Sequence, residues 1–209
     1  MRRLLFTALL CTSFFASSEE TISRWMSDYF KRIHDHIGNE NYEKAEYELE
    51  MGNNNYFRGG RTYEAALLYQ LYGQFYAVQS QYTEAVPWFE KALATDKMPR
   101  IGAQEVRFQL AQTYFMIGKY ENVISLLEEF IRVGERYKYP VSARANLLMS
   151  YSHGRLEQYE PSYYHIKQAN NKSDKPQIDW IEYAFSLAMK LENLDDAEDL
   201  GTRLLFLEP

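Results

Sequence analysis

The stretch YGQFYAVQSQYTEAVPWFEKAL, residues 72–93, decides the fold of this chain, because its small and large apolar residues recur at helical spacing. Apolar residues three and four positions apart are typical of amphipathic helices. Gly73 and Ala85 carry little or no side chain, so two helices can approach closely there while Phe89 fills the space around the contact. Pro87 is expected in the first turn of the second helix, where its missing N–H costs nothing. The stretch therefore predicts a pair of packed helices.

The same pattern recurs along the whole chain. A small residue in each expected second helix gives five positions at intervals of 40, 38, 39 and 35 residues: Ala45, Ala85, Val123, Ser162 and Ala197. Each of them follows an aromatic residue or a leucine by three positions, namely Tyr42, Tyr82, Tyr120, Tyr159 and Leu194. Because no such helix pair can bury its apolar stripe alone, we expect each pair to stack on the next one.

Residues 66–98 resemble a tetratricopeptide repeat (TPR), a helix-turn-helix unit of about 34 residues. The residues that carry this resemblance are Tyr69, Tyr72, Gly73, Tyr76, Ala85, Phe89 and Ala92, followed in the next unit by Leu110, Ala111, Tyr114, Gly118, Tyr120, Val123 and Leu127. The resemblance implies an all-α fold, a right-handed α-solenoid of about five TPR-like repeats. We expect a divergent N-terminal helical repeat and linker in residues 19–60, and a solenoid of four repeats, the third degraded, in residues 61–209.

The first eighteen residues have the pattern of a secretory signal peptide. Arg2 and Arg3 precede an apolar run over residues 4–16, which ends in small residues and is too short to span a bilayer. We expect cleavage after Ser18, an exported protein in the periplasm, and no transmembrane segment once the signal is removed. Cys11, the single cysteine, lies in this run; lipid anchoring there is disfavoured, because the residue before it is the bulky Leu10. The mature chain then holds no cysteine, which excludes disulfides and thiolate chemistry.

Signatures of catalysis and of metal or cofactor binding are missing from the sequence. It has no HExxH, GxSxG or GxxxxGK[ST] motif, and its four histidines lack metal-ligand spacing. We expect His153 in a turn and His165 on a helix, both near the surface. The pairs Glu128-Glu129 and Asp195-Asp196 are expected on solvated faces or in turns. We predict no enzyme, no cofactor and no metal, although a hydrolase site assembled from distant residues stays an alternative. The net charge of −6 disfavours nucleic acid as a partner.

A narrower resemblance concerns cellular function. Residues 63–99, the segment after them, and the polar, proline-containing loop that ends at Trp180 resemble secreted repeat proteins of proteobacteria that are associated with the TonB energy-transduction system. This resemblance implies a periplasmic scaffold for protein–protein interaction, an accessory of TonB-dependent iron or siderophore transport with TonB-system components as partners. The alternative is a scaffold for outer-membrane or cell-envelope assembly.

A binding groove is implied by the TPR resemblance, since the first helices of successive repeats line a concave surface in that family. By position, the groove-facing residues are Gln70, Gln74, Phe108, Gln112, Phe115, Met149 and Phe185. This amide-rich and apolar lining suits an extended or helical peptide segment. The alternative for the same residues is packing between repeats. An uncapped final helix would expose an apolar face, so we also expect a homodimer through the C-terminal helix.

Overall fold

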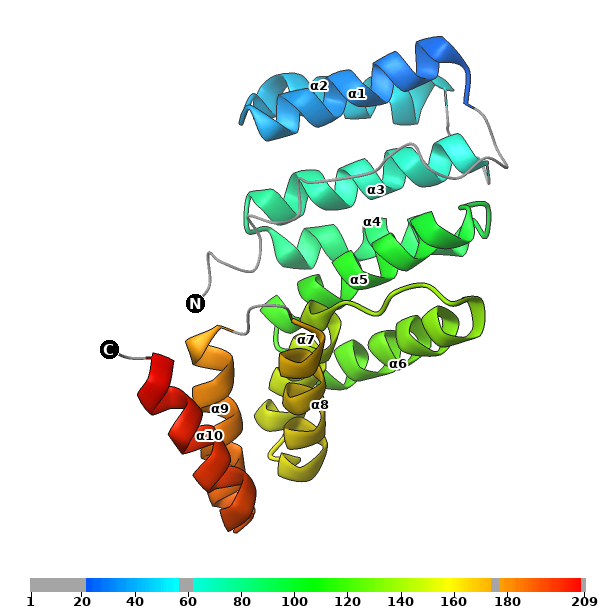
Figure 1. Cartoon of the computed structure of the whole chain (residues 1–209). Helices are drawn as coiled ribbons and strands as arrows, with labels where there is room; N and C mark the ends of the chain where they lie inside the picture. The colour runs from blue at the N-terminus through cyan, green and yellow to red at the C-terminus, as the bar shows by residue number, and fades with distance from the viewer. Residues whose placement is uncertain (1–21, 57–61, 174–176, 208–209) are drawn as a thin grey trace. The chain divides into compact units, whose positions relative to one another are not determined.

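A computed structural model describes residues 22–56, 62–173 and 177–207 of the chain (Figure 1). Within these ranges the secondary structure is helical, with ten α-helices, one short π-helix and no strand. The prediction of an all-α fold built from helix pairs is confirmed. The predicted signal peptide at residues 1–18 lies outside the described residues, as does most of the predicted linker that contains Gly59 and Gly60.

The helices form five consecutive pairs. Their bounds are α1 Arg24–Gly38 and α2 Tyr42–Met51, α3 Tyr63–Val78 and α4 Tyr82–Ala94, α5 Arg100–Met116 and α6 Tyr120–Tyr137, α7 Ala143–Arg155 and α8 Tyr159–Lys172, and α9 Ile178–Lys190 and α10 Leu194–Leu207. The π-helix η1, Gly52–Tyr56, extends α2. Every second helix begins at the aromatic residue or leucine that the repeat alignment singled out.

The turn inside each pair has a repeated backbone conformation. The residue two positions before each second helix has a positive φ, at Glu40, Ser80, Gly118, Glu157 and Glu192. In the first pair the N–H of Glu40 donates to the carbonyl of Ile37, and the N–H of Asn41 donates to that of His36. These two bonds form a Schellman motif, which satisfies carbonyls at the end of the first helix and reverses the chain. The same bonding recurs after α3, α7 and α9.

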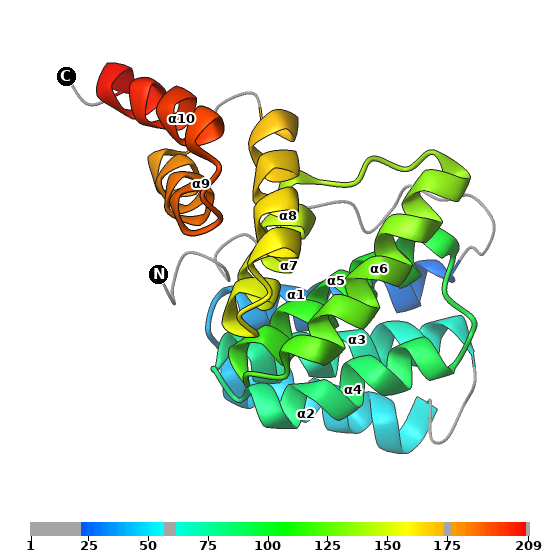
Figure 2. The same ribbon diagram turned by 90° about the horizontal axis from the view of Figure 1, so that it is seen from below.

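The helices form two compact units, residues 1–117 and 118–209, and each is described by itself. In the first unit α1 and α2 pack on α3, and α4 packs between α3 and α5. In the second unit α7 packs on α6 and α8, and α9 packs on α8 and α10; Figure 2 shows the last two pairs from below. A cluster centred on Ile166, Ile181 and Ala184 forms the core of the second unit.

Close contact between α3 and α4 depends on a glycine, as predicted. A Cβ atom added to Gly73 would lie 2.6 Å from two ring atoms of Phe89, and Phe89 is fully buried. Ala85, three residues into the second helix, is also fully buried. In the pair α7–α8 the small residue at the aligned position, Ser162, donates to the carbonyl of Ser150 at 2.8 Å, while the Ser150 hydroxyl donates to the carbonyl of Ser162 at 2.7 Å.

The expected place of Pro87 is wrong. Since α4 begins at Tyr82, Pro87 is the sixth residue of the helix and lies beyond its first turn. Its missing N–H leaves the carbonyl of Thr83 without the helical hydrogen bond. Both residues are exposed, so water can solvate that carbonyl.

We predict that Gly73→Ala destabilises the protein by about 1–3 kcal/mol, because the added methyl group overpacks the contact with the Phe89 ring. Gly102→Ala is the matched control, since Gly102 lies inside α5 and its added Cβ would meet one atom at 3.7 Å, an ordinary contact. The control should be neutral, or stabilised by up to about 1 kcal/mol through helix propensity. Urea unfolding followed by circular dichroism measures both changes, and equal midpoints for the two variants would contradict the assigned contact.

Candidate partner-binding site

Three of the predicted groove residues are buried in the first unit. Gln70 and Gln74 on α3 and Gln112 on α5 are 2%, 5% and 7% exposed. Phe108 and Phe115 on α5 are half-buried. Burial of the three amides favours the packing alternative for them, while a binding role of the whole set stays a prediction.

The amide of Gln70 connects two first helices. Its Nε2 donates to Oε1 of Gln109 on α5, at 3.1 Å, and the hydroxyl of Thr113 donates to the Gln109 carbonyl at 2.8 Å. Sequence reasoning missed Gln109, although it follows Gln70 by 39 residues, one repeat interval. Oε1 of the neighbouring Gln74 is buried and has no hydrogen-bond partner among the described residues. Leaving such an oxygen without a donor costs about 1–3 kcal/mol.

The two remaining groove residues lie in the second unit. Met149 on α7 is buried. Phe185 on α9 is half-buried and packs toward α10, where a Cβ added to Gly201 would lie 3.4 Å from its ring. On α10 itself, Leu205 and Phe206 are strongly exposed, at the place where contact with a second copy is predicted.

A pocket that sequence reasoning missed lies between α1 and α2. It has a volume of about 320 Å³ and is lined by Trp25, Asp28, Tyr29, Arg32, Tyr47, Glu48 and Met51. We call it the α1–α2 pocket. The hydroxyl of the buried Tyr29 donates to the backbone carbonyl of Glu48, and the guanidinium of Arg32 lies 5.4 Å from the centre of the Tyr29 ring. The helical spacing of the four lining residues on α1 (i, i+3, i+4, i+7) is the signal that could have found it.

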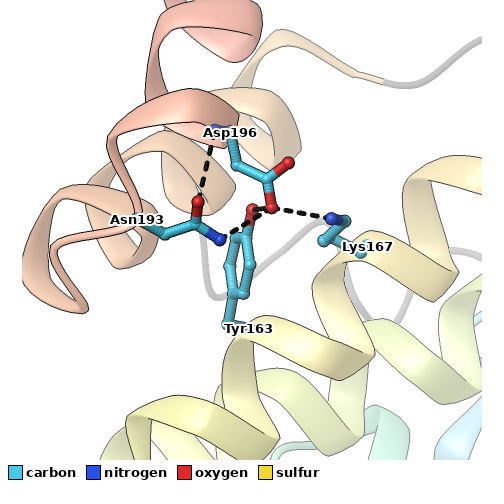
Figure 3. A network of polar contacts seen from close by, with 4 residues as sticks. All are labelled: Tyr163, Lys167, Asn193 and Asp196. Atoms are coloured by element: carbon cyan, nitrogen blue, oxygen red, sulfur yellow. Dashed lines mark hydrogen bonds and ion pairs between the residues drawn. The ribbon is translucent and has the colours of Figure 1, made fainter.

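Asp196 is the centre of a polar network between α8 and α10 (Figure 3). Its Oδ2 accepts hydrogen bonds from the Tyr163 hydroxyl at 2.6 Å, Lys167 Nζ at 2.8 Å and Asn193 Nδ2 at 2.9 Å. The hydrogen bond from Lys167 and, to a smaller extent, that from Tyr163 lower the pKa of Asp196. Burial and the hydrogen bond to Asp196 raise the pKa of Tyr163. Both aspartates lie in the first turn of α10 and not in a turn before it, and Asp196, although partly solvated, also joins two helix pairs.

We predict that Asp196→Asn destabilises the protein by about 1 kcal/mol at pH 7, since it removes charge-assisted bonds between partly solvated groups. A carboxyl whose folded-state pKa is lowered stabilises the fold above its unfolded pKa, and this contribution disappears as the pH falls through the folded value. The difference between wild type and variant should thus shrink below a pH of about 4. Asp195→Asn, in the same helical turn, is the control. Thermal melts at pH 3 and pH 7 measure the effect, which a pH-independent difference would contradict.

Two histidines stack between α7 and α8. The rings of His153 and His165 are nearly parallel, with an interplanar angle of 4° and centroids 5.6 Å apart. His153 lies in the last turn of α7 and is buried, so its expected place in an exposed turn is wrong. Nδ1 of His153 is 2.7 Å from Gln158 Oε1, and Nδ1 of His165 is 3.3 Å from Asn146 Oδ1. Burial first, then His153 and Lys172, lowers the pKa of His165 to about 4.

We predict that acid destabilises the fold through His165. Because its pKa is lowered from 6.5 to about 4 in the folded state, the neutral ring stabilises the fold above pH 6.5, and this stability is lost as the pH falls toward 4. His165→Gln should make the melting temperature less dependent on pH between 7 and 4. His36→Gln on α1, outside the stack, should leave that dependence unchanged. An identical pH profile for wild type and His165→Gln would contradict the prediction.

Neither a metal cluster nor a membrane span is found in the described part of the chain. No group of three or more His, Cys, Asp or Glu side chains is arranged to hold a metal ion there. None of the helices in that part is both long enough and apolar enough to cross a bilayer.

Comparison with known proteins identifies the type of fold. No protein-family model and no curated protein matches the chain. Among solved structures it is similar to residues 41 to the end of MamA from Desulfovibrio magneticus RS-1, with a TM-score of 0.69, 19% identity, and coverage of 90% of this chain and 97% of that one. YrrB, described as a TPR protein with an unusual peptide-binding site, gives a TM-score of 0.67 at 15% identity, covering 87% and 85% of the two chains. A putative kinesin light chain with TPR-like repeats gives 0.68 at 12% identity, covering 90% and 97%. The chain thus has the tetratricopeptide type of fold.

Proposed function

We propose that this protein is an exported TPR scaffold that binds another protein, and that it serves as an accessory of a TonB-dependent iron or siderophore transport system in the periplasm. The observation that carries the scaffold proposal is the position of its exposed apolar side chains. Among the described residues, six large apolar side chains are more than half exposed, and five of them belong to the first or last helix pair: Trp25, Tyr47, Leu194, Leu205 and Phe206. Leu205 and Phe206 are consecutive on α10, and contiguous exposed apolar surface marks interaction sites.

The fold supports the same proposal. Structures of this type include a protein described as having a peptide-binding site, and stacked helix pairs offer extended surfaces for a partner. The periplasmic location is supported by the basic and apolar pattern of residues 1–18. The TonB assignment is supported by the resemblance of residues 63–99 and of the loop before Trp180 to the TonB-associated repeat proteins.

We predict that a strain lacking this protein grows poorly when a ferric siderophore is its only iron source, because TonB-dependent uptake is impaired. Ferrous iron, which bypasses that uptake, should restore growth, and so should the full chain supplied in trans. In the complemented strain, cross-linking in whole cells should join the protein to TonB, ExbB or ExbD, as detected by immunoblot. Normal growth on the siderophore combined with increased sensitivity to detergent would instead favour the envelope-assembly alternative.

A further inference from the structure

We propose that the α1–α2 pocket binds a cationic side chain, an arginine or a lysine, presented by a peptide segment of the partner. This inference rests on the proposed function in one respect, namely that the ligand is a protein. It concerns a different surface from the predicted groove residues, none of which lines the pocket.

Three aromatic rings form the apolar wall of the pocket. Tyr29 is almost fully buried and fixed by its hydrogen bond to Glu48, while Trp25 and Tyr47 are 52% and 64% exposed. An aromatic face attracts a cation through its quadrupole, most strongly when the ring is a tryptophan. Both exposed rings can therefore be reached by a ligand from solvent.

Two carboxylates supply the negative charge. Among the described residues the side chain of Asp28 makes no hydrogen bond and no ion pair. Glu48 lies 3.6 Å from Arg32 Nε, which is an ion pair but too long for a hydrogen bond, so its oxygens keep unused acceptor capacity. With Asp28, Glu48 and Arg32 as its charged residues, the lining has one more negative than positive charge.

Arg32 already shows that the pocket accepts a guanidinium. Its charged group lies against the Tyr29 ring and pairs with Glu48, the combination of ring and carboxylate that we infer for the ligand. Because Arg32 is engaged by both of these groups, an anionic ligand would have to compete with Glu48 for it. The unpaired Asp28 and the exposed rings of Trp25 and Tyr47 favour a second cation instead. A volume of about 320 Å³ is at the lower end for ligand sites, and it suits one long side chain rather than a cofactor.

The test is a titration of the purified protein with Ac-Gly-Ala-Arg-Ala-Gly-NH₂, followed by the NMR signal of the Trp25 indole N–H. The signal is assigned with a Trp25→Phe variant, since the chain has three tryptophans. The control peptide carries citrulline, which keeps the shape of arginine but has no charge. We expect saturable shifts with the arginine peptide, weaker binding at higher salt, and no saturable shift with the citrulline peptide.

Matched variants locate the site. Tyr47→Ala should weaken binding about two- to fivefold through the lost cation–π contact. Asp28→Asn should weaken it by a similar factor. Tyr164→Ala removes a ring that is 59% exposed on α8, in the second unit, and should leave the affinity unchanged. These substitutions lie at exposed positions, so circular dichroism should show the same fold in each variant.

Two results with the arginine and citrulline peptides would overturn the inference: equal binding of the citrulline peptide, or no shift of the Trp25 signal. Two further results would also overturn it. One is binding of a glutamate-bearing peptide that Arg32→Ala abolishes, and the other is self-association of the protein that Tyr47→Ala abolishes. The last two would assign the pocket to an anion or to a second copy of the chain. Absence of peptide binding with a preserved cross-link to the TonB components would refute the pocket and leave the scaffold standing. Binding of the arginine peptide without a growth defect on siderophore would refute the TonB role alone.

Discussion

The rest of the structure depends on one constraint, the close approach of two consecutive helices, as between α3 and α4 or between α7 and α8. A left-handed residue two positions before the second helix reverses the chain, and a small residue three positions into that helix lets the partner approach. Four of the five left-handed residues are not glycine, and such a conformation costs roughly 1–2 kcal/mol for each of them. The Schellman hydrogen bonds and the buried contacts that follow, such as that between Gly73 and Phe89, offset this cost.

Two kinds of helix result from this arrangement. In α3, 12 of the 16 residues are buried. In α4, one face is exposed, and the buried residues are Ala85, Val86, Phe89 and Ala92. A helix that is buried on nearly every side needs partners for its polar side chains, and the bond between Gln70 and Gln109 provides one. The first helices of the first and last pairs are less buried, since α1 and α9 each have four buried residues, as α4 does.

This difference explains which features could be predicted from the sequence. The start of each second helix and its small residue follow from spacing along the chain, because the same local turn is repeated. The place of Gln70 and Gln74 does not, since periodicity identifies residues on one helical face but not what covers that face. When a helix is buried on every side, a face that was assigned to a groove can equally pack against a neighbouring repeat.

Electrostatic roles were the least predictable. Asp195 and Asp196 are neighbours of the same type, yet only Asp196 meets Tyr163, which lies 33 residues earlier in the chain. The stack of His153 on His165 likewise joins two helices through a contact that their sequence spacing does not specify. Such contacts depend on how one helix is rotated relative to another. The alignment of repeats does not determine this rotation.

At the α1–α2 pocket, the effect of a substitution on binding can be separated from its effect on folding, which is not so at the predicted groove residues. Among the described helices, α1 and α2 make extensive contacts only with each other, with η1 and with α3, so Trp25 and Tyr47 remain exposed. Tyr47, the more exposed of the two, gains the smaller free energy from burial, and replacing it should change binding without unfolding the pair. Replacing Gln70 would instead leave Gln109 with a buried amide oxygen that lacks a donor, and a lost partner could then reflect lost packing. Binding can therefore be measured at the pocket independently of stability, whereas at the buried glutamines the two effects are coupled.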